Sequence, residues 1–123
     1  SSKGERICRE VAEAFFKKPF PKARPSFLKN PKTGRSLELD CYNKELQIAI
    51  EYQGEQHDVY NPYFHRSEEE FKAQQERDAL KRDLCQQHGV TLILVPYQKD
   101  TRKIRKKLMK ALYSLHNDRL GSF

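Results

Sequence analysis

The chain has 123 residues, with 24 Lys and Arg against 17 Asp and Glu, so its formal net charge at pH 7 is +7. This length predicts one domain over residues 1–123 and leaves too little chain for two. No run of about 18 apolar residues occurs, which argues against a membrane-spanning helix. The excess of positive charge favours a polyanionic partner, nucleic acid first and an anionic membrane second. Of these we expect nucleic acid and no membrane.

The three cysteines, Cys8, Cys41 and Cys85, form an odd set without a C-x-x-C motif. They fall at apolar positions, which predicts small core residues with reduced thiols. Reduced thiols, together with an N-terminus that lacks the pattern of a signal peptide, favour an intracellular location in the cytoplasm or nucleus. The Ser-Ser start is typical of a domain excised from a longer protein with additional domains.

The first predicted element is an amphipathic helix over residues 3–18, where apolar residues recur at helical spacing. Ser2 is its expected N-cap, and Glu5 completes a capping box three residues later. Two prolines within residues 19–21 end this helix. Residues 26–28 are interpreted as a short edge strand that precedes a glycine-containing turn.

Two short strands joined by a tight turn are predicted over residues 37–41 and 46–50. The first alternates apolar and polar residues, as half-buried strands do, and the second is more apolar and more deeply buried. A hairpin brings Asp40 near Glu51, which follows the second strand directly. Two neighbouring carboxylates repel each other unless a cation lies between them. The pair therefore predicts a site for a hard divalent cation, Mg²⁺ or Mn²⁺.

A long second helix is predicted from its N-cap, Ser67, to the glycine that ends it, Gly89. Asp78 and Lys81 stand three residues apart and share one helical face. They form either an ordinary surface ion pair or a functional pair in which Lys81 enters the carboxylate site. A buried strand over residues 90–95 follows and is expected to pair in parallel with one strand of the hairpin.

Basic residues gather in the loop before the hairpin and on a last predicted helix over residues 100–116. The loop cations are interpreted either as solvated charges or as contacts to a phosphate backbone. The crowded cations of the last helix exceed what solubility needs and are interpreted as contacts to a phosphate backbone, independent of sequence and sensitive to salt. The expected contacts are Arg24, Lys29 and Arg35 in the loop and Lys99, Arg102, Lys103, Arg105, Lys106 and Lys107 at the last helix.

At this point the residues resemble a known family. Asp40 followed by Glu51-Tyr52-Gln53 is similar to the signature of the PD-(D/E)XK nuclease superfamily, with Gln53 where lysine usually stands. The longer string over residues 51–57, EYQGEQH, resembles the branch of very-short-patch-repair (Vsr)-like, EDxHD-type endonuclease domains.

The remainder of the chain extends this resemblance from about residue 2 to residue 97. In the Vsr-like branch a helix with a D-x-x-K motif follows the string, and Asp78 and Lys81 match that motif. A strand ending in Val-Pro-Tyr comes next in the branch and is matched at residues 92–97. The opening residues 2–5 resemble the start of the family's first helix, whose glutamate faces the metal site.

The resemblance implies an α/β, restriction-endonuclease-like fold with an αβββαβ core. Its mixed sheet would be flanked by helices, and this chain would add a basic C-terminal helix. The implied activity is metal-dependent hydrolysis of phosphodiester bonds by an endonuclease, on DNA in preference to RNA. Asp40, Glu51 and the backbone carbonyl of Tyr52 would hold Mg²⁺ or Mn²⁺, with help from Glu5.

The remaining implied catalytic residues act on the water and the phosphate. His57 or Lys81 would orient or deprotonate the attacking water, and Asp78 would hold one of them in place. Gln53 can form hydrogen bonds but cannot offset charge. The full set of candidate catalytic residues is Glu5, Asp40, Glu51, Gln53, His57, Asp78 and Lys81.

Two other functions are compatible with these features. Because the motif lysine is replaced by Gln53, the domain can be a nuclease-like module that binds nucleic acid without cutting it. A basic protein-interaction domain that contacts an acidic partner has the same charge pattern. Metal binding without turnover distinguishes the first alternative, and absence of nucleic-acid binding at low salt distinguishes the second.

Overall fold

The computed structural model describes residues 2–54, 60–63 and 65–121, in a mixed α/β arrangement of helices and strands. Its elements in chain order are α1 (Lys3–Phe16), the 3-10 helix η1 (Ser26–Leu28), β1 (Cys41–Asn43), β2 (Ile48–Tyr52), α2 (Glu68–Gln87), β3 (Thr91–Val95) and α3 (Arg102–Gly121). The predicted α/β class is confirmed at this level.

The described strands form one mixed sheet in the order β1-β2-β3. β1 and β2 are an antiparallel hairpin in which Cys41 is opposite Ile50. β2 and β3 are parallel, with Glu51 beside Leu94, and α2 forms the crossover between them. The predicted parallel pairing of the last strand is therefore confirmed.

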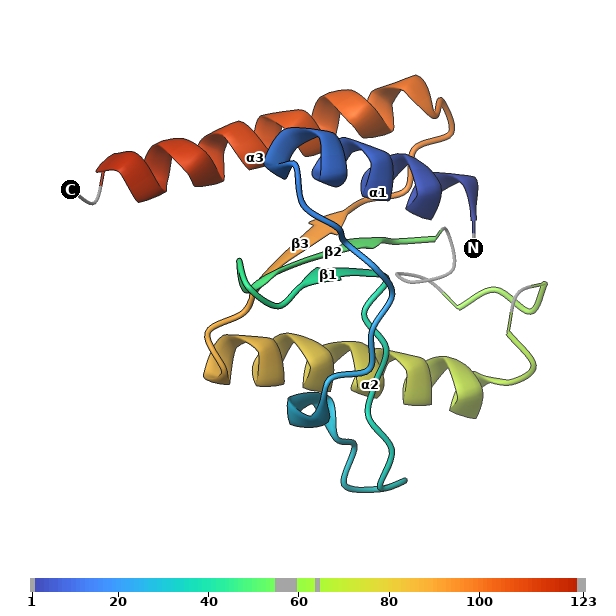
Figure 1. Ribbon diagram of the computed structural model, residues 1–123. Helices are drawn as coiled ribbons and strands as arrows, with labels where there is room; N and C mark the ends of the chain where they lie inside the picture. The colour runs from blue at the N-terminus through green and yellow to red at the C-terminus, as the bar shows by residue number, and fades with distance from the viewer. Residues whose placement is uncertain (1, 55–59, 64, 122–123) are drawn as a thin grey trace.

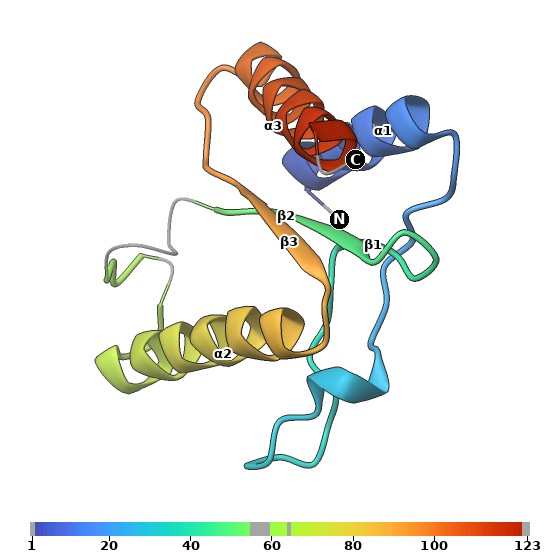
Figure 2. The ribbon, with the colours of Figure 1, turned by 90° about the vertical axis from the view of Figure 1, so that its left-hand side faces the viewer.

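Helices cover both faces of the sheet, as Figure 1 and the turned view of Figure 2 show. α1 and α3 pack together on one face, and α2 lies on the other. Because successive side chains of a strand point to opposite faces, β2 serves both layers. Ile48 and Ile50 join the core under α1 and α3, whereas Ala49 joins the core under α2.

Side-chain caps set the helix starts close to where the sequence predicts them. The Ser2 hydroxyl accepts from the Glu5 N–H at 3.1 Å, and the Ser67 hydroxyl accepts from the Glu70 N–H at 3.1 Å. The Asp100 carboxylate accepts from the Arg102 N–H at 3.0 Å at the start of α3. These bonds satisfy N–H groups that lack partners within the helix.

The prediction of an edge strand at residues 26–28 is wrong, because these residues form η1. Pro25 lacks an N–H group and so cannot donate to a strand ladder, while its carbonyl accepts from the Leu28 N–H at 3.0 Å to close the turn. Two strands, not three, separate α1 from α2 in the described residues. Only isolated bridges join this region, Ala23 to Leu39 and Lys29 to Ser36.

Other element bounds also differ from the prediction. β1 begins at Cys41 and not at residue 37, because the chain bends at Asp40. α3 continues to Gly121, five residues beyond its predicted end. None of the described helices is long and apolar enough to cross a membrane.

All three cysteines are buried and free, as predicted. Burial is the main cause that raises the pKa of the Cys8 and Cys41 thiols to about 12 and that of Cys85 to about 11. These thiols are therefore neutral at physiological pH and pack as small apolar groups.

The buried face of α3 should contribute strongly to stability. Leu108 is fully buried in the core between α3, α1 and the sheet, so Leu108→Ala leaves a cavity. We expect the free energy of unfolding to fall by about 2–5 kcal/mol, measured by urea denaturation. The neighbouring residue Lys107 is exposed and provides the control. Lys107→Ala should change the free energy of unfolding by less than about 0.5 kcal/mol. Equal effects of the two variants would contradict this packing.

Candidate active site

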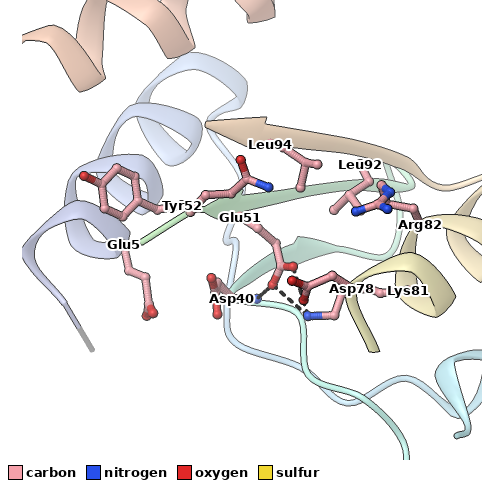
Figure 3. Close-up of a pocket in the computed structure, with 10 residues that line it drawn as sticks. Glu5, Asp40, Glu51, Tyr52, Asp78, Lys81, Arg82, Leu92 and Leu94 are labelled. Carbon is pink, nitrogen blue, oxygen red and sulfur yellow. Dashed lines mark hydrogen bonds and ion pairs between the residues drawn. The ribbon is translucent and has the colours of Figure 1, made fainter. Parts of the chain in front are cut away.

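A polar pocket of about 180 Å³ opens where β2 and the chain before β1 meet α1 and α2 (Figure 3). Four carboxylates and two cationic side chains lie around it, together with two leucines of β3. The residues that line it are Glu5, Asp40, Glu51, Tyr52, Gln53, Asp78, Lys81, Arg82, Leu92 and Leu94.

The alternation of β2 decides which way its polar end points. Glu51 is two residues after Ala49 and so emerges on the α2 face, whereas Tyr52 follows Ile50 onto the α1 face. On the α2 face the Lys81 Nζ lies 2.9 Å from Glu51 Oε1 and 3.2 Å from Oε2. The two side chains are only 15% and 14% exposed, so this ion pair is largely shielded from solvent.

Asp40 lies at the bend that leads into β1. Its backbone N–H donates to Glu51 Oε2 at 3.3 Å, which ties the two predicted metal ligands together (Figure 3). The Arg9 guanidinium donates to the backbone carbonyl of Asp40 and, at 3.0 Å, to that of Phe20. Arg9 therefore fixes the bend against α1 and acts as a positioning residue for Asp40.

The Asp40 carboxyl group has a pKa raised from 3.8 to about 6. Burial is the largest cause, and the negative charges of Glu51 and Glu5 add to it. Lys81 and Lys22 act in the opposite direction but do not compensate. A site that crowds carboxylates in this way favours the binding of a cation, since a cation removes their mutual repulsion.

Glu5 reaches the same pocket from the first turn of α1. Its Oε2 atom is buried and has no hydrogen-bond partner among the described residues, although Lys22 Nζ is 3.8 Å away. A buried carboxylate oxygen without a partner is costly, so this atom offers a further ligand position. Lys22 also pairs with Glu38 at 3.3 Å, and this interaction, with the charge of Glu5, raises the Lys22 pKa.

The close approach of α1 to β2 depends on Gly4. A Cβ atom on Gly4 would lie within 2.3 Å of ring carbons of Tyr52. The Tyr52 hydroxyl, in turn, accepts from the backbone N–H of Gln98 at 3.1 Å, which fixes the ring. Gly4 therefore allows the helix turn that carries Glu5 to contact the strand end that carries Glu51.

The residues present fit a small divalent cation with oxygen ligands. Among the described residues, no three His, Cys, Asp or Glu side chains form a group that could hold a metal ion as they stand. Mg²⁺, however, is usually held by one or two carboxylates and completes its shell with water and substrate phosphate. Asp40 and Glu51 satisfy that requirement, and the unpartnered oxygen of Glu5 lies in the same pocket.

The structure brings most of the predicted site residues together. Gln53 and Asp78 line the pocket with the carboxylates, and Lys81 pairs with Glu51, so it does not serve as an ordinary surface partner of Asp78. Tyr52 lines the pocket too, beside Val95 of β3. His57 lies outside the described residues, so its role remains a prediction.

The predicted phosphate contacts separate into two groups. α3 and the loop before the hairpin, which carry these cations, lie on opposite sides of the sheet in both views (Figures 1 and 2). The first group is Lys99, Arg102, Lys103, Arg105, Lys106 and Lys107, and the second is Arg24, Lys29 and Arg35.

Sequence reasoning missed several residues of the site. Arg9 gave no signal because its partners are backbone carbonyls, which no sequence motif marks. Gly4 was overlooked inside a helical pattern, although a glycine in a first helical turn points to close packing. Lys22 lies in the loop without a motif that links it to Glu5, and Arg82 follows Lys81 directly in the same helix.

Relatives of this chain are found among viral proteins. The chain is 52% identical over 96 residues to "Uncharacterized protein 033L" of Invertebrate iridescent virus 3, which covers 78% of this chain and 50% of the relative. With "Uncharacterized protein 307L" of Invertebrate iridescent virus 6 it is 48% identical over 111 residues, 78% of this chain and 56% of the relative.

A third relative decides the family. The chain is 47% identical over 110 residues to "Uncharacterized protein 094L" of Frog virus 3 (isolate Goorha), covering 88% of this chain and 71% of the relative. The chain belongs to the 094L family. It spans about half the length of the 033L and 307L relatives. No family model and no solved structure matches the chain.

Gly4→Ala provides a test of the contact that positions Glu5. Alanine is the better helix former by about 1 kcal/mol, yet its methyl group would clash with Tyr52. We expect the free energy of unfolding to fall by about 1–3 kcal/mol in urea denaturation. In a Tyr52→Ala background the same change should be neutral or stabilising, because helix propensity alone remains. Stabilisation in the wild-type background would contradict the contact.

The raised pKa of Asp40 predicts a pH-dependent cost to stability. Because the folded state binds this proton more tightly than the unfolded state, the stabilisation is complete below about pH 4 and is lost as pH rises through 6. Asp40→Asn should therefore be more stable than wild type at pH 7, by roughly 2–3 kcal/mol, with the difference vanishing near pH 4. Urea denaturation in chelator from pH 4 to 8 measures this.

The exposed Asp83 on α2 supplies the matched control. Asp83→Asn should show no such dependence, since the cause lies in the burial and crowding of Asp40. If the free energies of unfolding of wild type and Asp40→Asn differed by the same amount across this pH range, the predicted link between stability and the titration of Asp40 would be contradicted.

Proposed function

We propose that this domain is an endonuclease that hydrolyses phosphodiester bonds with Mg²⁺ or Mn²⁺, and that DNA is preferred to RNA. The observation that carries the proposal is the convergence of Asp40, Glu51 and Glu5 with Lys81 in one pocket. The crowding that raises the pKa of Asp40 supports a cation at this position. The net charge of +7 supports a polyanionic substrate.

In this proposal Asp40 and Glu51 hold the ion, and Glu5 and the Tyr52 backbone carbonyl are additional oxygen ligands. A bound divalent ion lowers the pKa of a coordinated water and offsets charge on the phosphoryl oxygens. Arg9 keeps Asp40 in position through the Asp40 carbonyl, and Gly4 keeps Glu5 in reach. The chain thus supplies oxygen ligands from three separate elements.

Lys81 supplies the positive charge that the motif position lacks. Gln53 lines the pocket but is neutral, whereas Lys81 extends from α2 to within 2.9 Å of Glu51. An ammonium group there can orient the attacking water and stabilise negative charge in the transition state. Asp78 lines the same pocket one helical turn before Lys81, and His57 is proposed as a further proton-transferring group.

The order of elements supports a restriction-endonuclease-like core. A helix, an antiparallel hairpin, a helical crossover and a parallel strand follow one another as the resemblance implies. The strand expected before the hairpin is replaced by η1 and by the isolated bridges from Ala23 and Lys29. We propose that this region is a reduced form of the strand that precedes the hairpin in the restriction-endonuclease-like core.

Nicking of supercoiled plasmid tests the proposal. Wild-type protein is expected to nick or linearise the plasmid with Mg²⁺ or Mn²⁺ and not with chelator. Asp40→Asn and Glu51→Gln should each lower the cleavage rate by about 100-fold or more, because each removes a charged ligand at nearly constant volume. Asp83→Asn, which changes an exposed carboxylate of α2, should cleave normally.

Each other outcome has a defined meaning. Full cleavage by Asp40→Asn or Glu51→Gln would overturn the assignment of the site. Salt-sensitive DNA binding without cleavage under any metal condition would support a nuclease-like module that does not cut. Absence of both binding and cleavage would support a basic protein-interaction domain.

A further inference from the structure

Two arginines of the loop before the hairpin and one arginine of α2 line a second, separate groove. This arginine groove has a volume of about 440 Å³. Its lining residues come from the loop before the hairpin and from α2, and these two segments lie on the opposite side of the sheet from α3 (Figures 1 and 2). Its lining residues are Arg24, Asn30, Thr33, Arg35, Ser36, Leu37 and Arg77.

The arginine groove is positively charged and contains no acidic lining residue. Within the described part of the chain, neither Arg35 nor Arg77 forms an ion pair. Arg24 donates to the Ser36 carbonyl at 3.1 Å and to Glu38 at 3.0 Å, so its guanidinium is held in place. Guanidinium groups bind phosphate oxygens through paired hydrogen bonds, which makes a phosphodiester backbone the matching ligand.

The arginine groove connects to the pocket through two elements. Leu37 lines the groove and Asp40 lines the pocket, and three residues span at most about 10 Å. On α2, Arg77 lines the groove and its neighbour Asp78 lines the pocket. Since phosphates of one strand advance about 3.4 Å each along a duplex, the segment between Leu37 and Asp40 spans at most about three phosphates.

The basic face of α3 lacks this connection. α3 packs on α1, on the other side of the sheet from the α2 residues that line the pocket. Two of its arginines already have acidic neighbours, because Arg102 bonds to Asp100 at 3.1 Å and Arg105 lies 3.8 Å from Glu10. The fold therefore connects the arginine groove, through residues 37–40 and through Arg77 and Asp78, to the pocket on the α2 side of the sheet.

We propose that the arginine groove binds the phosphate backbone of the strand that is cut, on one side of the scissile phosphate. Arg35 and Arg77 make the main contacts, and Arg24 supports them from the loop. That the bound strand is the one that is cut rests on the proposed nuclease function. The binding of phosphate itself is testable without cleavage.

The salt dependence of DNA binding tests the assignment. Binding of a short fluorescent DNA duplex is followed by anisotropy in chelator over a range of NaCl concentrations, so that no cleavage occurs. Arg35→Ala and Arg77→Ala should each reduce the slope of log K against log[salt] by about 0.9, and the double variant by about 2. The matched double variant Lys103→Ala/Lys106→Ala on α3 should leave the slope unchanged.

Several results would overturn the assignment. One is an unchanged slope in the Arg35→Ala/Arg77→Ala variant with an unaltered thermal unfolding midpoint. Another is a reduction of the slope in the α3 variant alone, and a third is absence of DNA binding by the wild-type protein. Equal competition by poly-glutamate would also overturn it, because it would indicate a general acidic partner. If the groove variants lower the slope of log K against log[salt] while wild-type protein cleaves no plasmid, phosphate binding by the arginine groove would be upheld and the proposed nuclease function would be rejected.

Discussion

The ion pair between Glu51 and Lys81 is the interaction on which the site depends. It joins the end of β2 to the middle of α2, with both side chains about 15% exposed. A charge at this depth is costly without a partner, and removing either member of such a pair leaves the other uncompensated. The alternation of β2 directs the Glu51 carboxylate to the α2 face, and the pair holds it against α2. The pair also brings α2, with Asp78 and Lys81, to the pocket that Asp40 and Glu5 complete.

The carboxylates of the pocket are held together against their mutual repulsion. Arg9 binds the carbonyl of Asp40, and Gly4 lets α1 approach Tyr52, so backbone contacts enforce a proximity that the charges oppose. The raised pKa of Asp40 is the electrostatic consequence. Electrostatic repulsion of this kind, with a perturbed pKa, is common at functional sites, which bind a ligand at some cost to the stability of the protein. In the proposed function a divalent cation relieves it.

The two most basic segments of the chain lie on opposite sides of the sheet. α3 and the loop before the hairpin both carry many cations, and the linear sequence presents both as candidate phosphate contacts. In the fold they lie on opposite faces, and the loop cations share theirs with α2. Arg77 joins them from α2 and completes a groove that leads toward the pocket.

The sequence by itself determined the helices with their caps at Ser2 and Ser67, the hairpin, the parallel last strand and the burial of the cysteines. It also predicted that Asp40 lies near Glu51, because strand periodicity and short turns are local properties. Only the tertiary structure decided that residues 26–28 turn, that Lys81 pairs with Glu51, and that Arg9 and Gly4 position the site. These features depend on contacts between residues far apart in the chain, where backbone carbonyls and close packing leave no pattern in the sequence.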